Sequence, residues 1–201
     1  MKKQQLHQSK IFISLSLIAI AGSGCTKLHN NSQFSGSNEF TPMSNSEEWQ
    51  VIRVSDGDTI VVRQMDGREK KLRLCGVDSP EIKHGKQPGQ ALGIEAKANL
   101  QRLVDEADKT VMVTEIESDR YGRTVAEVFS SKNGVEKSLN EEQLSSGLAM
   151  VYRSYVKKCP NAITLGKAEE IAKNKKLGVW GDSSTVPPWE FRKRQRQNNG
   201  N

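Results

Sequence analysis

The segment VIRVSDGDTIVV, residues 51–62, sets an Asp-Gly pair between two runs rich in β-branched side chains. Such a pair predicts a β-hairpin, because Asp and Gly both tolerate the backbone angles of a tight turn. The turn accounts for Asp56 and Gly57 but not for Asp58, which adds a second acid at the same place. Whether Asp58 binds something depends on the other residues that the chain brings to this turn.

The sequence around this hairpin changes from strand patterns to helix patterns and back. β-branched residues and Asp-Gly turns predict strands at 49–55, 58–65, 70–77, 110–118 and 124–131. Apolar residues at helical spacing predict helices at 93–107, 138–147 and 161–178. This order belongs to the α+β class. It suits a five-stranded Greek-key β-barrel of the oligonucleotide/oligosaccharide-binding (OB-fold) type with three helices.

Length and charge set the outer limits of the interpretation. The chain has 201 residues, which suits one domain with additional ends, and a formal net charge of +6. A basic balance is compatible with a polyanionic partner but does not identify one. Cleavage before Cys25 would remove three lysines and no acids, so the net charge would fall from +6 to +3.

Residues 1–24 predict an export signal of the lipoprotein type. A positive start precedes the apolar stretch IFISLSLIAIAG, which is short for a membrane-spanning helix, and GSGC follows. GSGC resembles a bacterial lipoprotein processing site, in which Cys25 is lipidated and becomes the first residue. Gly22 stands where such sites usually carry an aliphatic residue, so ordinary cleavage between Ala19 and Gly24 is the alternative. We expect an exported monomer, either a membrane-anchored lipoprotein or a secreted protein.

The rest of the chain divides by composition. Residues 25–48 are rich in Asn, Ser and Gly and predict a flexible linker. Residues 49–185 carry the periodic patterns of one domain, without an internal repeat. Residues 186–201 are a basic, polar tail with a Pro pair near its start. We expect this tail to be a solvated end, and the alternative is that it adds phosphate contacts at low salt.

The segment LRLCGVDSPEIKHG, residues 72–85, places two acids, Asp78 and Glu81, directly after a strand. On their own, these acids fit a solvated turn at Pro80. Arg73 is harder to explain in this way, because a guanidinium between two strand leucines needs an anionic partner or water. The segment therefore points to a polar site at the end of this strand.

A further cluster lies in ESDRYGRTVAEV, residues 117–128, where Arg120 and Arg123 flank Tyr121-Gly122. Alone, this is an ordinary strand-joining turn with exposed charges. Together with the two acidic clusters it gains chemical meaning. The two arginines can donate paired hydrogen bonds to phosphate oxygens and offset the charge that develops at phosphorus.

The acids supply the complementary part of such a site. Asp58, Asp78 and a backbone carbonyl offer the hard oxygen ligands that Ca²⁺ prefers. Glu81 can orient or deprotonate a water molecule. The sequence has no CxxC or HxxxH spacing, and His84 alone in the folded part gives no zinc site.

Five segments in order, SDGDTI, LRLCGVDSPEIKHG, DRYGRTVAEVF, GLAMVY and AKNKKLGVW, resemble the thermonuclease (staphylococcal nuclease-like) family. The likeness runs from about residue 49 to about residue 182, and VPPWEFRKRQ is similar to the ending of bacterial secreted members. The resemblance implies an OB-type barrel and Ca²⁺-dependent phosphodiester hydrolysis of DNA and RNA. It also implies the metal ligands, namely the carboxylates of Asp58 and Asp78 and the carbonyl of Ser79. Ser79 replaces a common Thr, which matters little where only the carbonyl binds.

The same resemblance assigns catalysis to Arg73, Glu81 and Arg123. Tyr121 and Tyr155 are candidates for the nucleotide site, by stacking or by hydrogen bonding, and packing is the alternative role for Tyr155. Two other functions stay open. Barrels of this type also occur as non-catalytic nucleic-acid-binding or protein-binding modules, and the chain could equally be a surface lipoprotein with the barrel as scaffold.

With Cys25 lipidated, two cysteines remain, Cys75 and Cys159. Export makes oxidation possible, so the two can pair. Cys75 lies on the same strand face as Arg73, and Cys159 follows the segment that carries Tyr155, so their sulfurs could meet over the site. The alternative is a buried free Cys75 and an incidental loop cysteine.

Overall fold

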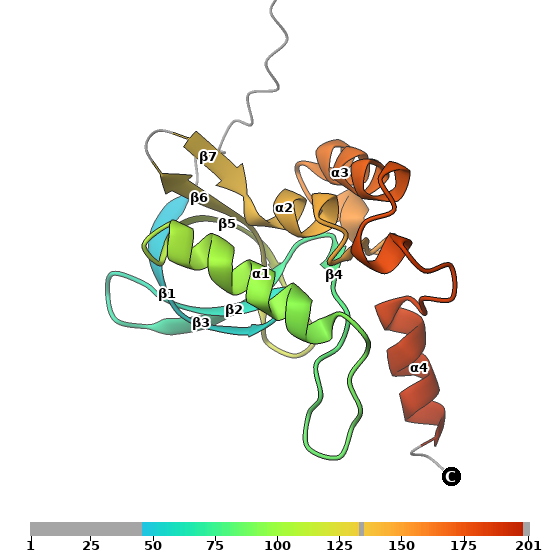
Figure 1. Ribbon diagram of the computed structural model, residues 1–201. Coiled ribbons are helices and arrows are strands. Elements are labelled where there is room, and N and C mark those ends of the chain that lie inside the picture. Colours follow the sequence, from blue (N-terminus) through green and yellow to red (C-terminus); the bar gives the residue numbers. More distant parts are fainter. Residues whose placement is uncertain (1–45, 133–134, 199–201) are drawn as a thin grey trace, which may run out of the picture. The chain divides into compact units, whose positions relative to one another are not determined.

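The Asp56-Gly57 turn joins the first two strands of a closed barrel in the computed structural model, which describes residues 46–132 and 135–198 (Figure 1). The expected export signal 1–24, the lipidation residue Cys25 and most of the linker 25–48 lie outside the described residues. Among the helices of the described ranges, none combines the length and the apolar character that a membrane crossing requires.

The barrel is built from five strands. They are β1 (Glu47–Asp56), β2 (Thr59–Arg63), β3 (Glu69–Leu74), β5 (Thr110–Ser118) and β6 (Thr124–Lys132). Neighbours in the order β3-β2-β1-β5-β6 are antiparallel, and the parallel pairing of β3 with β6 closes the ring. The closing register sets Arg73 opposite Val125. The predicted α+β class and five-stranded barrel are confirmed.

Three short strands complete the sheets. β7 (Val135–Ser138) extends the barrel sheet beyond β6. β4 (Val77–Asp78) and β8 (Met150–Val151) form a separate two-stranded sheet. This small sheet matters for the site, because it fixes the backbone at Asp78 immediately after the barrel strand that carries Arg73.

The helices are α1 (Gly93–Glu106), α2 (Leu139–Ser145), α3 (Ala162–Asn174) and α4 (Pro188–Asn198), with 3₁₀ turns η1 (Val156–Lys158) and η2 (Gly178–Trp180). α1 lies across the barrel, α2 and α3 gather beside it, and α4 stands apart from them (Figure 1). The expectation of three helices was one too few for the described residues. α4 falls in the tail 186–201, where Pro188 occupies the first helical position and good helix formers follow.

Sequence patterns locate the other helices well. The buried face of α1 includes Ala96, Leu100 and Leu103, as its helical spacing predicts. Ser138 caps α2, and its hydroxyl accepts a hydrogen bond from the Glu141 N–H at 3.2 Å. Asn161 precedes α3 without capping it, because its side chain donates to the Glu127 carboxylate at 2.6 Å instead.

Two glycines let the segments GLAMVY and KKLGVW meet. Gly147 and Gly178 both have positive φ, 71° and 51°. A Cβ on Gly147 would lie 2.3 Å from the Leu177 carbonyl oxygen, and a Cβ on Gly178 would lie 2.0 Å from the Gly147 carbonyl oxygen. The Val179 N–H donates to that same Gly147 oxygen at 2.8 Å. Glycine is required at both positions by conformation and by contact.

The structure joins Cys75 and Cys159 in a disulfide with a Cα–Cα distance of 5.9 Å. Both residues are buried. The bond links the end of β3 to the chain between η1 and α3, so it ties the barrel to the helical part of the domain.

Candidate functional site

The hairpin turn is pressed against the segment that follows β4. The Asp56 carboxylate accepts a hydrogen bond from the Asp58 N–H at 3.1 Å, which closes the turn. A Cβ on Gly57 would lie 2.6 Å from the Ser79 hydroxyl oxygen, so only glycine permits this approach. From α2, the Gln143 amide donates to the Gly57 carbonyl at 2.5 Å. The turn therefore has a fixed position, and Asp58 is held with it.

Asp58 and Asp78 converge on one guanidinium. Both carboxylates are buried, and Arg73 donates to each of them, at 2.6 Å to Asp78. Arg73 also donates to the Val77 carbonyl at 3.1 Å, and the Ser79 N–H donates to the second Asp58 oxygen at 2.8 Å. The guanidinium that looked out of place between two leucines thus has two anionic partners.

Burial and pairing act against each other in this group. Burial alone would raise the pKa of Asp58, but the Arg73 charge and several hydrogen bonds hold that pKa below its usual value. Burial alone would lower the pKa of Arg73, yet the Asp58 and Asp78 charges raise it. Burial and the neighbouring Asp58 charge raise the pKa of Asp56 to about 7. Asp58 therefore stays ionised beside Arg73, and its charge favours the protonated form of Asp56.

The donors here fit a hard cation. Asp58, Asp78 and Ser79 can offer two carboxylates and a carbonyl, which are oxygen ligands of the kind that Ca²⁺ takes. Within residues 46–132 and 135–198, no group of three or more His, Cys, Asp or Glu side chains is arranged to hold a metal. A cation at this place would therefore need the carbonyl and water to complete its shell.

Glu81 lies just beyond these acids and is held by two partners. Its backbone N–H donates to the Gln90 side-chain oxygen at 3.1 Å. Its carboxylate accepts from Arg192 of α4 at 2.6 Å, and Arg192 also binds Asp78 with two hydrogen bonds, at 2.9 and 2.8 Å. Burial would lower the pKa of Arg192, but hydrogen bonds and charge from Asp78 and Glu81 raise it.

Arg123 enters from the other side of the same cleft. Asp119 accepts hydrogen bonds from the Arg123 backbone N–H at 3.0 Å and from its Nε at 2.7 Å. Burial alone would raise the Asp119 pKa, but these bonds lower it. Tyr121 is exposed and lies beside Arg120 and Arg123, at 4.8 and 5.6 Å from their guanidinium carbons to its ring centre.

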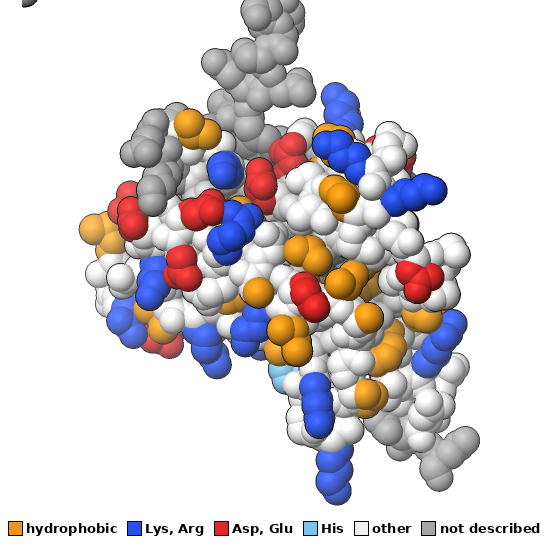
Figure 2. All heavy atoms as spheres, viewed as in Figure 1, with side chains coloured by type: hydrophobic (Ala, Val, Ile, Leu, Met, Phe, Trp, Pro, Cys, Tyr) orange, Lys and Arg blue, Asp and Glu red, His pale blue; other side chains and the backbone are white. Residues whose placement is uncertain are grey.

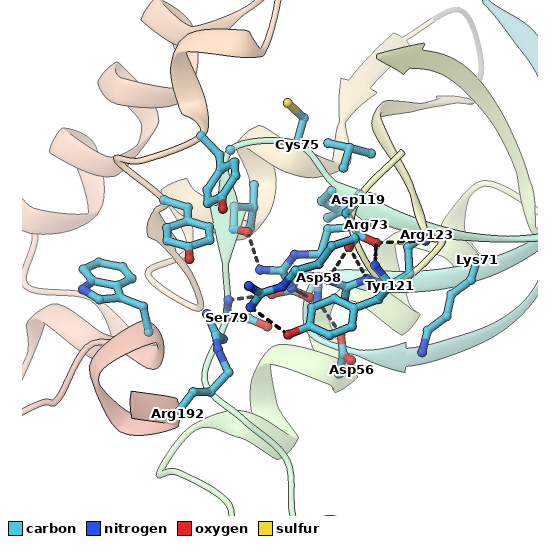
Figure 3. Close-up of a pocket in the computed structure, with 18 of the residues that line it drawn as sticks. Asp56, Asp58, Lys71, Arg73, Cys75, Ser79, Asp119, Tyr121, Arg123 and Arg192 are labelled. Atoms are coloured by element: carbon cyan, nitrogen blue, oxygen red, sulfur yellow. Dashed lines mark hydrogen bonds and ion pairs between the residues drawn. The ribbon is translucent and has the colours of Figure 1, made fainter. Parts of the chain in front are cut away.

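A cleft of about 710 Å³ brings these groups together (Figure 3). The sequence-predicted residues that line it are Asp58, Arg73, Cys75, Ser79, Glu81, Arg120, Tyr121, Arg123 and Tyr155. Asp78 lies behind this lining, fully buried under Arg73 and Arg192. The Tyr155 side chain is about half exposed and its ring lies 4.8 Å from the Tyr152 ring, so it faces the cleft and also packs.

Sequence reasoning missed two residues of the site. Asp119 was visible as the acid that begins the DRYGR turn, four residues before Arg123, a spacing at which an acid can orient an arginine. Arg192 lies in the tail that the sequence predicts to be solvated. The structure corrects this expectation, because residues 188–198 form α4 and Arg192 reaches Asp78 and Glu81.

One family model and several known proteins are similar to this chain. The model described as "Staphylococcal nuclease homologue" matches residues 71–182. An "Uncharacterized endonuclease" of Escherichia coli O157:H7 is 36% identical over 146 residues, which cover 72% of this chain and 84% of that protein. A "Micrococcal nuclease" of Shigella flexneri is 34% identical over 149 residues, covering 72% and 79%. A "Thermonuclease" of Staphylococcus hyicus is 34% identical over 139 residues, covering 69% and 79%.

Proposed function

We propose a function from one premise: the chain belongs to the staphylococcal nuclease family. It is a nuclease that hydrolyses phosphodiester bonds, and we infer that it requires Ca²⁺ and acts on DNA and RNA. The proposal rests on one observation: Arg73, Glu81 and Arg123 line the same cleft as Asp58. A scaffold or a simple binding module would not need two arginines and a carboxylate around one cavity.

The metal would be held by Asp58, Asp78 and the Ser79 carbonyl. When bound there, Ca²⁺ would supply a positive charge for the phosphate oxygens and the attacking water. Arg73 already links the two carboxylates, so it would keep them oriented and could share a phosphate oxygen. Because the two acids are buried, few water molecules would compete with a phosphate at this place.

Glu81 would take the proton of the attacking water, since its carboxylate is partly exposed at the cleft and held from behind by Arg192. Arg123 would donate to the phosphate from the opposite side and stabilise the charge gained in the transition state. Asp119 would orient Arg123 through Nε and one terminal nitrogen, which leaves the other terminal nitrogen for the substrate. Tyr121 and Tyr155 would contact the nucleotide by stacking or hydrogen bonding.

The test follows cleavage of denatured DNA and calcium binding by calorimetry in the same protein. Hydrolysis should require millimolar-range Ca²⁺ and stop with chelator. Asp58→Ala should lose both calcium binding and hydrolysis. Asp66→Ala is the matched control, because Asp66 also begins an Asp-Gly turn but is exposed and bound to Arg68. Full activity in chelator, or unchanged calcium binding in Asp58→Ala, would refute the metal assignment.

Glu81→Gln separates chemistry from binding in the same assays. It should still bind Ca²⁺, while turnover falls by about 10²-fold or more, the scale of a lost general base. Glu95→Gln, an exposed glutamate in the first turn of α1, should change neither. A calcium-binding Glu81→Gln protein with near-normal turnover would remove Glu81 from the proton-transfer role.

A further inference from the structure

α4 is fixed at the edge of the cleft by three separate contacts. The Gln90 side chain, which accepts from the Glu81 N–H, also donates to the Val186 carbonyl just before α4 at 2.8 Å. Trp189 stacks on Tyr152, with ring centres 5.8 Å apart and an angle of 9° between the planes. Arg192 is the third contact, through its bonds to the site acids. The helix is therefore built onto the loop that carries Glu81.

One face of α4 is turned toward the cleft. Trp189, Arg192 and Arg196 all line it, and their spacing of three and four residues puts them in one row along the helix. Lys193 and Arg194 are exposed and do not line the cleft. Figure 3 shows Arg192 reaching from this helix toward Ser79.

Arg196 differs from most other cations of the cleft. Arg73, Arg123, Lys158 and Arg192 are each paired with an acid. Arg196 is exposed and has no acidic partner within the part of the chain that the structure describes. The Arg196 guanidinium, one helical turn beyond Arg192, is available for an anion that extends out of the cleft.

The face of the molecule in Figure 2 offers no alternative binding surface for a polyanion. On the face in Figure 2, Lys and Arg side chains are scattered, with Asp and Glu between several of them. A polyanion would find no broad basic patch on that face. Three cations that line the cleft, Lys71, Arg120 and Arg196, have no acidic partner among residues 46–132 and 135–198, and the cleft that they line also contains aromatic rings.

We propose that the cleft-facing side of α4 is a binding subsite for single-stranded nucleic acid, with Arg196 as its phosphate contact. Arg192 anchors the helix on Asp78 and Glu81. Trp189 and Tyr152 provide aromatic rings that would contact the bases of the bound nucleic acid. A single strand fits this combination because its backbone follows cations while its unpaired bases lie on aromatic surfaces. The inference rests on the proposed nuclease function and extends its substrate site to the end of the chain.

The experiment compares two arginines of the same helix. In a Glu81→Gln background that prevents cleavage, a fluorescent single-stranded DNA of mixed sequence is titrated with Ca²⁺ present. Adding Arg196→Gln should raise Kd about threefold to tenfold at low salt, and should reduce the slope of log K against log salt by about 0.7, the value for one lost phosphate contact. Adding Arg194→Gln should change neither quantity.

The outcomes separate the two proposals. Equal Kd values and salt slopes in the Arg196→Gln and Arg194→Gln proteins would overturn the α4 subsite, whether both bind normally or both lose affinity through general charge. If the unmodified chain still cleaves DNA with Ca²⁺, the nuclease proposal survives that result. A chain that neither binds nor cleaves DNA would overturn both.

Discussion

Arg123 and Arg68 are held by aspartates in nearly the same way. Each follows a turn, and each donates from Nε to an aspartate, Arg123 to Asp119 at 2.7 Å and Arg68 to Asp66 at 2.6 Å. Only Arg123 lines the cleft. The local geometry of an arginine therefore does not determine its role, which depends on what lies on the far side of the guanidinium.

This comparison gives a prediction for Arg123→Lys. Lysine keeps the charge but lacks the planar fork, so it cannot hold Asp119 and a phosphate at the same time. We expect kcat on DNA to fall by about 10²-fold or more, the scale of one lost transition-state donor. Arg68→Lys is the control and should leave kcat and the melting temperature nearly unchanged, because exposed ion pairs contribute little. A rate for Arg123→Lys equal to that of Arg68→Lys would refute the fork argument.

At the scale of elements, the disulfide joins two parts of the fold that are distant in sequence. It closes a loop with a sequence separation of 84 residues between the barrel and the start of α3. In the chain-entropy model such a loop stabilises the folded state by about 4–5 kcal/mol, and disulfides typically contribute about 2–4 kcal/mol. Cys75 also lines the cleft, but it is not among the proposed metal ligands.

Reduction should therefore lower the melting temperature without abolishing calcium binding. The double variant Cys75→Ser/Cys159→Ser should melt at a similarly reduced temperature and should no longer respond to reductant. Intact-mass analysis without reductant should show two fewer hydrogens than the free dithiol. Two freely alkylated thiols in the native protein would contradict the bond.

Elements that depend on neighbouring residues were predictable from sequence. The Asp56-Gly57 turn, the amphipathic face of α1 and the Ser138 cap all follow from residues within a few positions of one another. The position of α4 does not, because Arg192 meets Asp78 across a sequence separation of 114 residues. The sequence of a basic tail does not show whether the tail is solvated or packed against the domain. The acids that decide the matter lie elsewhere in the chain.

At the scale of the whole molecule, the described residues include the proposed catalytic site but not the segment predicted to direct export. The predicted export signal 1–24 and Cys25 lie outside the described residues, so export and anchoring stay predictions. We expect metabolic labelling with a fatty-acid analogue to mark the wild type and not Cys25→Ser. A Cys75→Ser protein serves as the cysteine control and should be labelled like the wild type. An unlabelled wild type whose mature chain begins at another residue would favour secretion.

The contact between Gly147 and Gly178 shows that part of the family resemblance reflects packing and not catalysis. Each glycine leaves room for the other's backbone, and neither lies in the cleft. Two of the five segments that carry the family resemblance therefore contribute the glycines that pack the helical part, while the proposed metal ligands and the proposed catalytic residues lie in the other three. A descendant that kept both glycines and replaced Glu81 would still be recognised as kin, and would hold nucleic acid without cutting it.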